Sequence, residues 1–132
     1  SGWRVEALMD RLAAHPLRGR SIHLHGALPD AEVEAHLARA TALLFPSLAE
    51  GYGYPPLEAA LAGTLPICSD LPALQENLGK SVLYLDTRDP QAWLETIKQH
   101  VLGNAVLPTL PLPKVPGWPA HFEKVGRALE MI

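Results

Sequence analysis

Short apolar runs of strand length alternate with segments of helical periodicity along most of this chain. Ala42–Phe45, Leu65–Cys68 and Val82–Leu85 are such runs. Ser21–His25 also looks like a short strand, which Gly26 closes. Runs without polar interruption are typical of strands that are buried on both faces of a parallel sheet. Strands that alternate with helices in this way favour βαβ units. The sequence therefore predicts an α/β fold, with a parallel sheet that carries helices on both faces.

The segments between the apolar runs contain helix signals. Val5, Leu8 and Leu12 follow the spacing of one helix face, and Asp89 followed by Pro90 is suited to begin a helix. Glycines follow several of these segments, as they commonly do at helix ends. The predicted helices cover about residues 3–14, 30–39, 55–62, 72–78, 90–102 and 119–132.

Residues 104–118 break this alternation and are expected to form an extended linker. Prolines recur through this stretch, and each proline fixes φ and removes a backbone donor, which makes a segment stiff. Phe122, Val125 and Leu129 then mark a last helix. The predicted organisation is an α/β domain over residues 1–103, the linker over 104–118 and a C-terminal helix over 119–132.

Composition excludes several classes of protein. Hydrophobic residues make up 48% of the 132 residues and charged residues 19%, which suffices for a core and is inconsistent with disorder. The net charge of -3, without a basic run, argues against nucleic acid as a partner. No apolar stretch approaches the ~18 residues of a membrane span. The single cysteine, Cys68, cannot form an internal disulfide, so a reducing, cytoplasmic compartment is expected.

The stretch 46–58 stands between an apolar run and a helix, and it contains more than a turn requires. In parallel α/β sheets, ligands bind at the carboxyl ends of strands, where such loops lie. Gly51 and Gly53 would let the backbone approach a ligand closely, and the helix that follows would attract an anion such as a phosphate. Glu50 precedes the glycines, and Glu58, in the first helical turn, could accept hydrogen bonds from paired hydroxyls. Simpler interpretations remain open, because Glu58 could serve only the helix dipole and the glycines only the turn.

His23 and His25 would share one side of a strand, which raises the possibility of a metal site. Two imidazoles, with Asp30 as the only carboxylate nearby in sequence, make an incomplete set of ligands. We therefore expect no metal ion here. Cys68 lies within an apolar run and is expected to pack in the core.

The whole string around the two glutamates is more specific than its parts. It reads Pro-Ser-x-x-Glu-Gly-x-Gly-x-Pro-x-x-Glu-Ala over residues 46–59, followed by Ala-Gly-Thr and then Ser-Asp-x-Pro. This pattern resembles the retaining nucleotide-sugar glycosyltransferases of GT-B architecture, of the group 1 or family 4 type. Their signature, two glutamates separated by seven residues, is present as Glu50 and Glu58. The resemblance extends from Gly2 to Pro90 and implies a partial, Rossmann-like C-terminal domain that binds the nucleotide-sugar donor.

The resemblance also implies a role for each residue of this signature. Glu50 would contact hydroxyls of the transferred sugar near its reacting face, and is the candidate catalytic residue. Glu58 would bind the ribose of the nucleotide, with Leu57 beside the nucleotide. The strand end at His25 and Gly26 would lie near the base. The sugar and the diphosphate would meet the backbone of the intervening loop, formed by Gly51, Tyr52, Gly53 and Tyr54.

The chain departs from the family pattern in three ways. Position 54 is more usually leucine, so the hydroxyl of Tyr54 could tune the choice of sugar. Pro66 removes one ladder donor, which suggests an edge strand or a local bulge. The Arg and Lys with which the family neutralises the diphosphate are absent, and the nearest cations in sequence are Arg39 and Lys80. The acceptor-binding N-terminal domain is absent as well, so we expect a fragment of an enzyme.

The resemblance implies an activity when the enzyme is intact. It would transfer a sugar from a nucleoside diphosphate, with GDP-mannose as the expected donor, and retain the anomeric configuration. The acceptor would be a glycan or a lipid-linked molecule of bacterial surface polysaccharide or lipopolysaccharide assembly, bound through the missing domain. No metal or other cofactor is expected, and the intact enzyme would be cytoplasmic or peripheral to the inner membrane. The alternative is a non-catalytic nucleotide- or sugar-binding module with the same fold.

A strand arrangement follows from the resemblance. The family sheet has six parallel strands in the order 3-2-1-4-5-6, and the four predicted strands would be the third to the sixth. Ala42–Phe45 would then be left with an exposed edge, which is a template for pairing. We expect either that Ile22–His25 closes against this edge or that the edge pairs between molecules.

Overall fold

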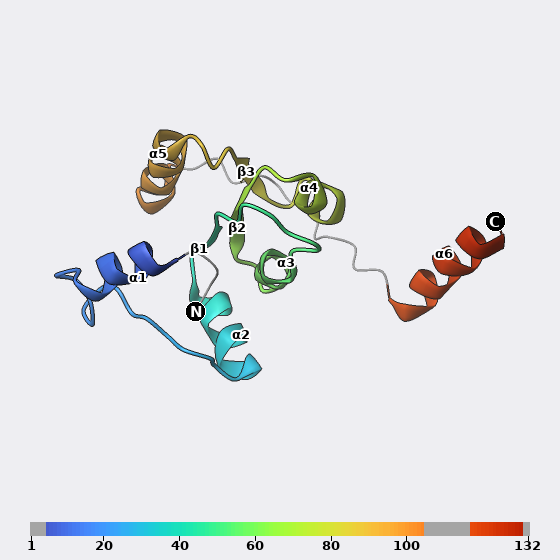
Figure 1. The fold of residues 1–132 in the computed structure, drawn as a ribbon, viewed down its shortest axis with the longest axis horizontal. Coiled ribbons are helices and arrows are strands. Elements are labelled where there is room, and N and C mark those ends of the chain that lie inside the picture. The colour runs from blue at the N-terminus through green and yellow to red at the C-terminus, as the bar shows by residue number, and fades with distance from the viewer. Residues whose placement is uncertain (1–4, 105–116, 131–132) are drawn as a thin grey trace. The chain divides into compact units, whose positions relative to one another are not determined.

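A computed structural model describes residues 5–104 and 117–130. Residues 1–35 and residues 36–132 form two compact units, and each is described by itself. The elements in chain order are α1 (Glu6–Ala13), α2 (Asp30–Arg39), β1 (Ala42–Phe45), α3 (Tyr54–Leu61), β2 (Leu65–Ser69), α4 (Pro72–Leu78), β3 (Leu83–Leu85), α5 (Pro90–Val101) and α6 (Trp118–Glu130) (Figure 1).

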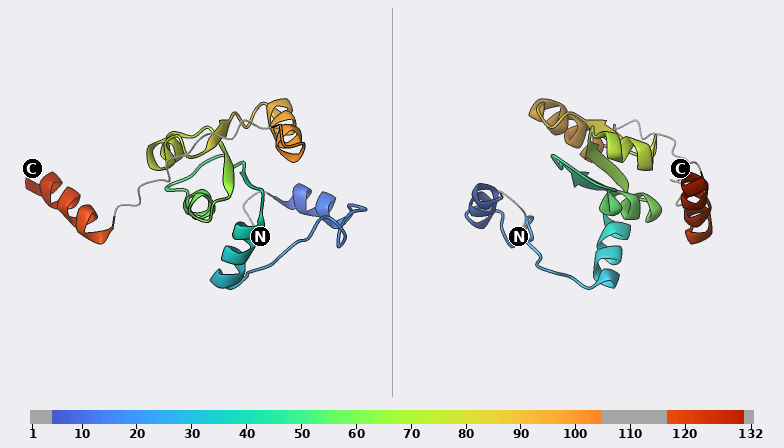
Figure 2. Two further views of the ribbon diagram at one scale, coloured as in Figure 1. Left: turned by 180° about the vertical axis from the view of Figure 1, so that it is seen from behind. Right: turned by 45° about the vertical axis from the view of Figure 1, so that its right-hand side comes forward.

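The second unit is built on a parallel sheet with the strand order β1-β2-β3. Phe45 of β1 is the register partner of Cys68 of β2, and Ser69 of β2 is the partner of Leu85 of β3. Figures 1 and 2 show β2 between its two neighbours, with helices around the sheet. The predicted α/β class is confirmed, and the order matches that implied for the last three strands of the family sheet.

The core of this unit joins α3, α4 and the central strand. All five residues of β2 are buried, because β2 has a strand on each side and α3 packs against it. One cluster of buried apolar side chains comes from α3, from β2, from α4 and from the residue before β3, namely Leu57, Cys68, Leu74, Leu78 and Val82. The expectation that Cys68 packs in the core is confirmed, since its side chain is fully buried.

The predicted strand Ser21–His25 is not formed. Within this stretch the described structure has one β-bridge, from Ile22 to Arg18. The N–H groups of Ser21 and Ile22 are used in a local turn, because both donate to Leu17 O at 3.0 and 3.1 Å. Gly19, with φ of 75°, closes this turn. A strand requires a ladder partner, and among the described residues this segment has only the single bridge. The expected pairing with β1 is therefore wrong.

Pro66 corrects a second expectation, because it lies in the central strand and not at an edge. It is fully buried and is the register partner of Leu43 in β1. The ladder between β2 and β3 begins only at Ile67. At Pro66 the strand therefore pairs with β1 alone. On the side of β3 the ladder has not yet begun, so the N–H that proline lacks is not needed there.

The helices follow the sequence signals closely. Asp89 caps α5 by accepting from the N–H groups of Gln91 and Ala92 at 3.1 and 3.0 Å, and Gly79 ends α4. The proposed linker lies mostly outside the described residues. In residues 5–104 and 117–130, no helix has the length and apolar character needed to cross a bilayer.

Candidate functional site

The signature loop, residues 46–53, connects the carboxyl end of β1 to the start of α3. Its last residue, Gly53, has φ of 86° and ψ of 48°, in the left-handed region that favours glycine. Gly53 is also buried, and a methyl group added there would overlap Leu74 Cδ2. The loop therefore lies directly against α4, and a Cβ at this point would have to displace the buried Leu74 side chain.

Contacts from neighbouring elements fix the conformation of this loop. Asn77 Nδ2 of α4 donates to the Tyr52 carbonyl at 3.0 Å. The rings of Tyr52 and Tyr54 stack with centroids 4.7 Å apart. Tyr52 also packs against the core cluster, whereas Tyr54 is exposed. The hydroxyl of Tyr54 can therefore reach a ligand, while Tyr52 holds the loop against the protein.

Glu50 is oriented before any ligand arrives. It is partly buried, and Ser47 Oγ donates to its Oε1 at 2.9 Å. Burial, and to a smaller extent the charge of Glu50, raises the pKa of the Cys68 thiol in β2 to about 12. Ser47 follows the end of β1 by two residues, so its hydrogen bond holds the Glu50 carboxylate near the carboxyl edge of the sheet.

Glu58 is exposed on α3. The helix begins at Tyr54, so Glu58 falls in its second turn and not in the first, as the sequence suggested. Leu57 beside it is 6% exposed and belongs to the core cluster. Of the two residues, only Glu58 offers its side chain to a ligand, and Leu57 could contact one through its backbone alone.

The N-terminus of α3 offers few donors to an anion. Pro55 and Pro56 have no N–H, and the Leu57 N–H donates to Gly53 O at 3.2 Å. Among the first four helical residues, Tyr54 is therefore the one whose backbone N–H could donate to a bound anion. An anion at this terminus would depend on that group and on the amides of the glycine loop, in addition to the helix dipole.

His25 and Gly26 belong to the first unit and are exposed there. His25 lines an open pocket of about 470 Å³ together with Arg18, Gly19, Ile22, His23 and Leu24. His23 Nε2 lies 3.2 Å from Arg20 O. Because no strand forms here, the argument that placed both imidazoles on one side of a strand is wrong. Of the predicted site residues, Glu50, the glycine loop and Glu58 therefore lie in the second unit, whereas His25 and Gly26 lie in the first.

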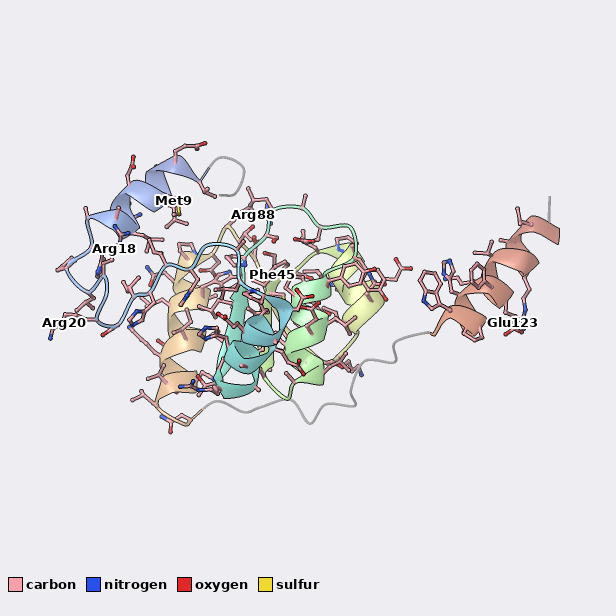
Figure 3. The ribbon with its side chains drawn as sticks, turned by 90° about the horizontal axis from the view of Figure 1, so that it is seen from below. Met9, Arg18, Arg20, Phe45, Arg88 and Glu123 are labelled. Atoms are coloured by element: carbon pink, nitrogen blue, oxygen red, sulfur yellow. The ribbon has the colours of Figure 1, made fainter. Side chains whose placement is uncertain are left out.

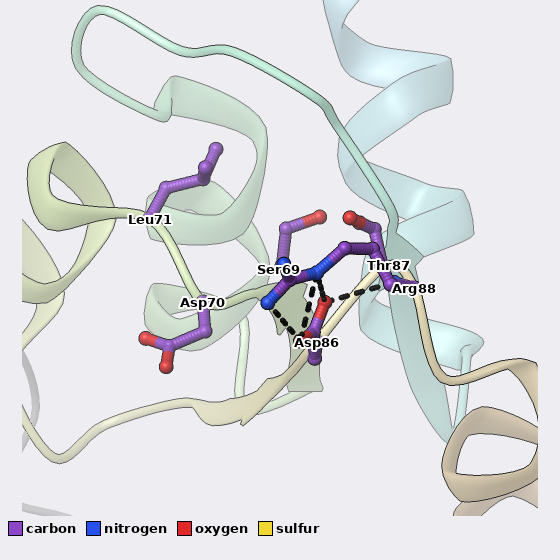
Figure 4. Close-up of a pocket in the computed structure, with 6 residues that line it drawn as sticks. All are labelled: Ser69, Asp70, Leu71, Asp86, Thr87 and Arg88. Carbon is purple, nitrogen blue, oxygen red and sulfur yellow. Dashed lines mark hydrogen bonds and ion pairs between the residues drawn. The ribbon is translucent and has the colours of Figure 1, made fainter.

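The sequence analysis missed a polar pocket at the carboxyl ends of β2 and β3. It has a volume of about 270 Å³ and is lined by Ser69, Asp70, Leu71, Asp86, Thr87 and Arg88 (Figure 4). Arg88 donates to both oxygens of Asp86, with distances of 2.7–3.1 Å. The hydrogen bonds from Arg88 lower the pKa of Asp86 to about 2. Ser69 and Asp70 belong to the Ser-Asp-x-Pro part of the family pattern. The signal that linked them to Asp86, Thr87 and Arg88 was that both groups directly follow predicted strands.

Arg88 is also a cation that the sequence did not connect with the signature loop. In the sequence, Arg39 and Lys80 are the cations nearest to the loop. Phe45 ends β1 and Arg88 follows β3, and both are labelled in Figure 3. Since the three strands are parallel, both residues lie at the carboxyl edge of the sheet.

Among the described residues, no group of three or more His, Cys, Asp or Glu side chains converges in a way that could hold a metal ion.

Comparison with known proteins agrees with the signature. The family model for glycosyl transferases group 1 matches residues 2–102. O-antigen chain mannosyltransferase RfbU of Salmonella typhimurium is 39% identical over 67 residues, covering 51% of this chain and 19% of the relative. O-antigen chain mannosyltransferase B of Escherichia coli is 32% identical over 103 residues, covering 78% of this chain and 26% of the relative.

A further relative is the serotype-specific mannosyltransferase WbdA of Escherichia coli, 28% identical over 106 residues, which covers 75% of this chain and 13% of the relative. The chain thus spans about a quarter or less of the length of these relatives. No solved structure matches it significantly. Since the family model covers most of the chain, including both glutamates of the signature, the chain belongs to the family of glycosyl transferases group 1.

Proposed function

We propose that this chain is the donor-binding part of a retaining glycosyltransferase that takes its sugar from a nucleoside diphosphate. The main support is the signature loop, which places Glu50 at the carboxyl edge of the sheet and Glu58 on the exposed side of α3. Between the two carboxylates lies a backbone that passes through Gly53 without room for a side chain. This arrangement offers one acceptor group to each of two polyhydroxylated rings, with main-chain donors between them.

The two carboxylates would act differently. Glu50, which Ser47 already holds in one orientation, would accept hydrogen bonds from hydroxyls of the transferred sugar beside the reacting carbon. Such an interaction is useful to the extent that it strengthens in the transition state. Glu58 would accept from the two ribose hydroxyls of the nucleotide, and thus contribute to binding more than to rate.

The names of the relatives support a narrower proposal. Two of them are named as O-antigen chain mannosyltransferases, and a third is named as a serotype-specific mannosyltransferase. We therefore propose GDP-mannose as the donor and a growing glycan or lipid-linked glycan as the acceptor. The acceptor-binding domain and the cations for the diphosphate would lie outside these 132 residues. The intact enzyme would work in the cytoplasm, at or near the inner membrane, without a metal ion.

The two carboxylates can be tested in the intact enzyme that contains this chain. Glu58→Ala should weaken GDP binding by about 1.5–3 kcal/mol for each ribose hydrogen bond lost, with a smaller effect on kcat. Glu50→Gln should lower kcat on the order of 10²-fold, with little change in GDP affinity. Calorimetry with GDP and steady-state kinetics with GDP-mannose measure the two effects.

Glu95→Gln is the matched control, because Glu95 is exposed on α5, away from the signature loop, and its carboxylate accepts a hydrogen bond from the Gln99 side chain one turn later. It should change neither quantity. The reverse pattern, with Glu50 governing nucleotide affinity and Glu58 governing kcat, would contradict the assigned roles. Normal GDP binding without any sugar transfer by the intact wild-type enzyme would favour the non-catalytic alternative.

A further inference from the structure

The pocket after β2 and β3 is separate from the signature loop in sequence but opens at the same edge of the sheet. Ser69 is the last residue of β2, and its Oγ donates to Phe45 O, the carbonyl from which the signature loop begins, at 3.5 Å. Thr87 and Arg88 follow β3, which is the next strand of the ladder. Whatever occupies this pocket is therefore next to the start of the loop that carries Glu50.

The walls of the pocket are fixed by contacts that do not involve a ligand. Asp86 O accepts from the Asp89 N–H at 3.1 Å and from Trp93 Nε1 at 3.0 Å. Asp86 Oδ1 accepts from the Arg88 N–H at 2.8 Å, and the same carboxylate holds the guanidinium. Ser69, which is 1% exposed, forms the floor. The turn from Asp86 to Asp89 is thus formed before a ligand binds, and the exposed Arg88 side chain pairs with Asp86 on it.

Several polar groups remain available on these walls. A guanidinium carries five N–H donors, and Asp86 engages Nε and one hydrogen of Nη2, which leaves three donors. The hydroxyl of Thr87 is exposed and can both donate and accept. Figure 4 shows the Thr87 and Arg88 side chains next to Ser69, with Asp70 turned away from them. A ligand that matches this set must itself supply both donors and acceptors.

The charges disfavour an anion as the ligand. The guanidinium of Arg88 is already neutralised by Asp86 in a bidentate pair. Asp70, whose carboxylate accepts from Gln75, adds a negative charge to the lining. A phosphate would have to compete with Asp86 for the arginine. An uncharged polyol would not, because its hydroxyls can accept from the remaining N–H groups and donate to oxygens of the lining.

We propose that this pocket is a subsite for one uncharged sugar ring. The inference rests on the proposed function, and the ring would be either the sugar of the donor or the terminal sugar of the acceptor. A volume of about 270 Å³ is just below the range of ~300–1,000 Å³ of pockets for drug-sized ligands. It suits a single ring and is too small for a whole nucleotide sugar. Arg88 and Thr87 would bind the ring hydroxyls, with Asp86 positioning Arg88.

Amide chemical shifts of the 15N-labelled 132-residue chain can test the proposal with four separate probes. Methyl α-D-mannopyranoside should shift the amides of residues 69–71 and 86–88, with a Kd on the order of millimolar. GDP should instead shift residues 51–54 and 58. Inorganic phosphate at the same concentration should leave residues 86–88 unchanged. GDP-mannose is the fourth probe and distinguishes the source of the ring.

A variant pair isolates the role of the arginine fork. Arg88→Lys keeps the charge but removes the planar donor set. It should raise the Kd for the mannoside at least about fivefold. Arg127→Lys is the matched control, since Arg127 also pairs with a carboxylate, Glu123, but on α6, and should have no effect. Thr87→Val should weaken the mannoside about threefold or more while it preserves the side-chain shape.

Each outcome has a distinct meaning. If GDP-mannose shifts residues 86–88 and 51–54 together, the ring belongs to the donor. If it shifts only 51–54 while the mannoside still shifts 86–88, the ring belongs to the acceptor. No mannoside shift at 69–71 and 86–88, or a phosphate shift equal to that of the mannoside, overturns the subsite. Absence of any GDP effect at 51–54 and 58 counts instead against the proposed function.

Discussion

Gly53 is the residue at which sequence, backbone and packing constrain one another most tightly. Its φ of 86° is unfavourable for a residue with a Cβ, and the space that a Cβ would need is taken by Leu74. Gly51, two residues earlier, is exposed, has open space around its Cα, and is not among the glycines with positive φ. The two glycines of the signature therefore have different physical roles.

This difference gives a direct prediction. Gly53→Ala should reduce the free energy of unfolding by at least about 2 kcal/mol, since backbone strain adds to overpacking. Gly51→Ala should change it by less than about 0.5 kcal/mol. Urea denaturation of the 132-residue chain, followed by circular dichroism, measures both. Equal effects of the two substitutions would contradict the packing of the loop against α4.

Cys68 and Tyr84 predict how stability depends on pH. Burial raises the pKa of Cys68 from 9.0 to about 12, with a smaller contribution from Glu50. Burial likewise raises the pKa of Tyr84 from 10.0 to about 12, and its hydroxyl donates to carbonyls of Leu74 and Gly79. Both groups lose their protons more readily in the unfolded chain. Their contribution to stability is therefore complete below pH 9 and is lost as the pH rises toward 12.

We expect the free energy of unfolding to fall as the pH is raised from 9 toward 12. One such group contributes a slope of at most about 1.4 kcal/mol per pH unit. Cys68→Ala should give a flatter profile, even though it lowers the absolute stability by leaving a cavity. Denaturation at a series of pH values measures the slopes. Identical slopes for Cys68→Ala and wild type would show that the thiol is not held neutral by burial.

At the scale of elements, β1 is one of the two edge strands of the three-stranded sheet. Among the described residues its ladder partner is β2 alone, and Leu44 is 45% exposed on it. Edge strands present unpaired backbone groups and promote pairing between chains. The pairing of Ser21–His25 with β1 is not observed, so pairing between molecules remains the expected outcome for the 132-residue chain.

The prediction is concentration-dependent association through β1. Sedimentation velocity should show a growing dimer or oligomer fraction as the protein concentration rises. Leu44→Lys should suppress it, because a charged side chain on an edge strand disfavours pairing. Leu61→Lys is the control, since Leu61 is 50% exposed but lies on α3. A wild-type chain that stays monomeric throughout, or equal effects of the two lysines, would refute this role of β1.

At the scale of the whole molecule, the chain covers 19% and 26% of two of its relatives. We predict that the 132-residue chain by itself transfers no sugar. The amides of the signature loop and the Tyr54 N–H hold a diphosphate weakly without dedicated cations, so GDP should bind with a Kd on the order of millimolar, or about 4 kcal/mol. Kinetic assays with GDP-mannose and calorimetry with GDP test both points, and measurable turnover would contradict the first.

Much of the fold could be predicted from local sequence. The apolar run Ala42–Phe45 is a strand over the predicted residues, and Asp89 begins α5 as its capping chemistry suggested. Gly79 ends α4 and Cys68 is buried. These features depend on residues close in sequence, through capping, periodicity and apolar content. The signature string could likewise be recognised as a continuous segment, without knowledge of the tertiary structure.

Features that depend on partners distant in sequence were decided by the tertiary structure alone. Ser21–His25 has strand-like residues but only a single bridge among the described residues. Pro66 lies in the central strand because β2 pairs with both neighbours, and it is tolerated there because the ladder with β3 begins one residue later. The pocket of Ser69, Thr87 and Arg88 exists because parallel pairing brings two strand ends together across an intervening helix. The sequence by itself determined the helices and the three strands of the sheet, since capping and periodicity are local, but it did not determine whether Ser21–His25 becomes a strand. Tertiary structure decided which of them meet, because hydrogen-bonded ladders and burial require a neighbour that local sequence does not specify.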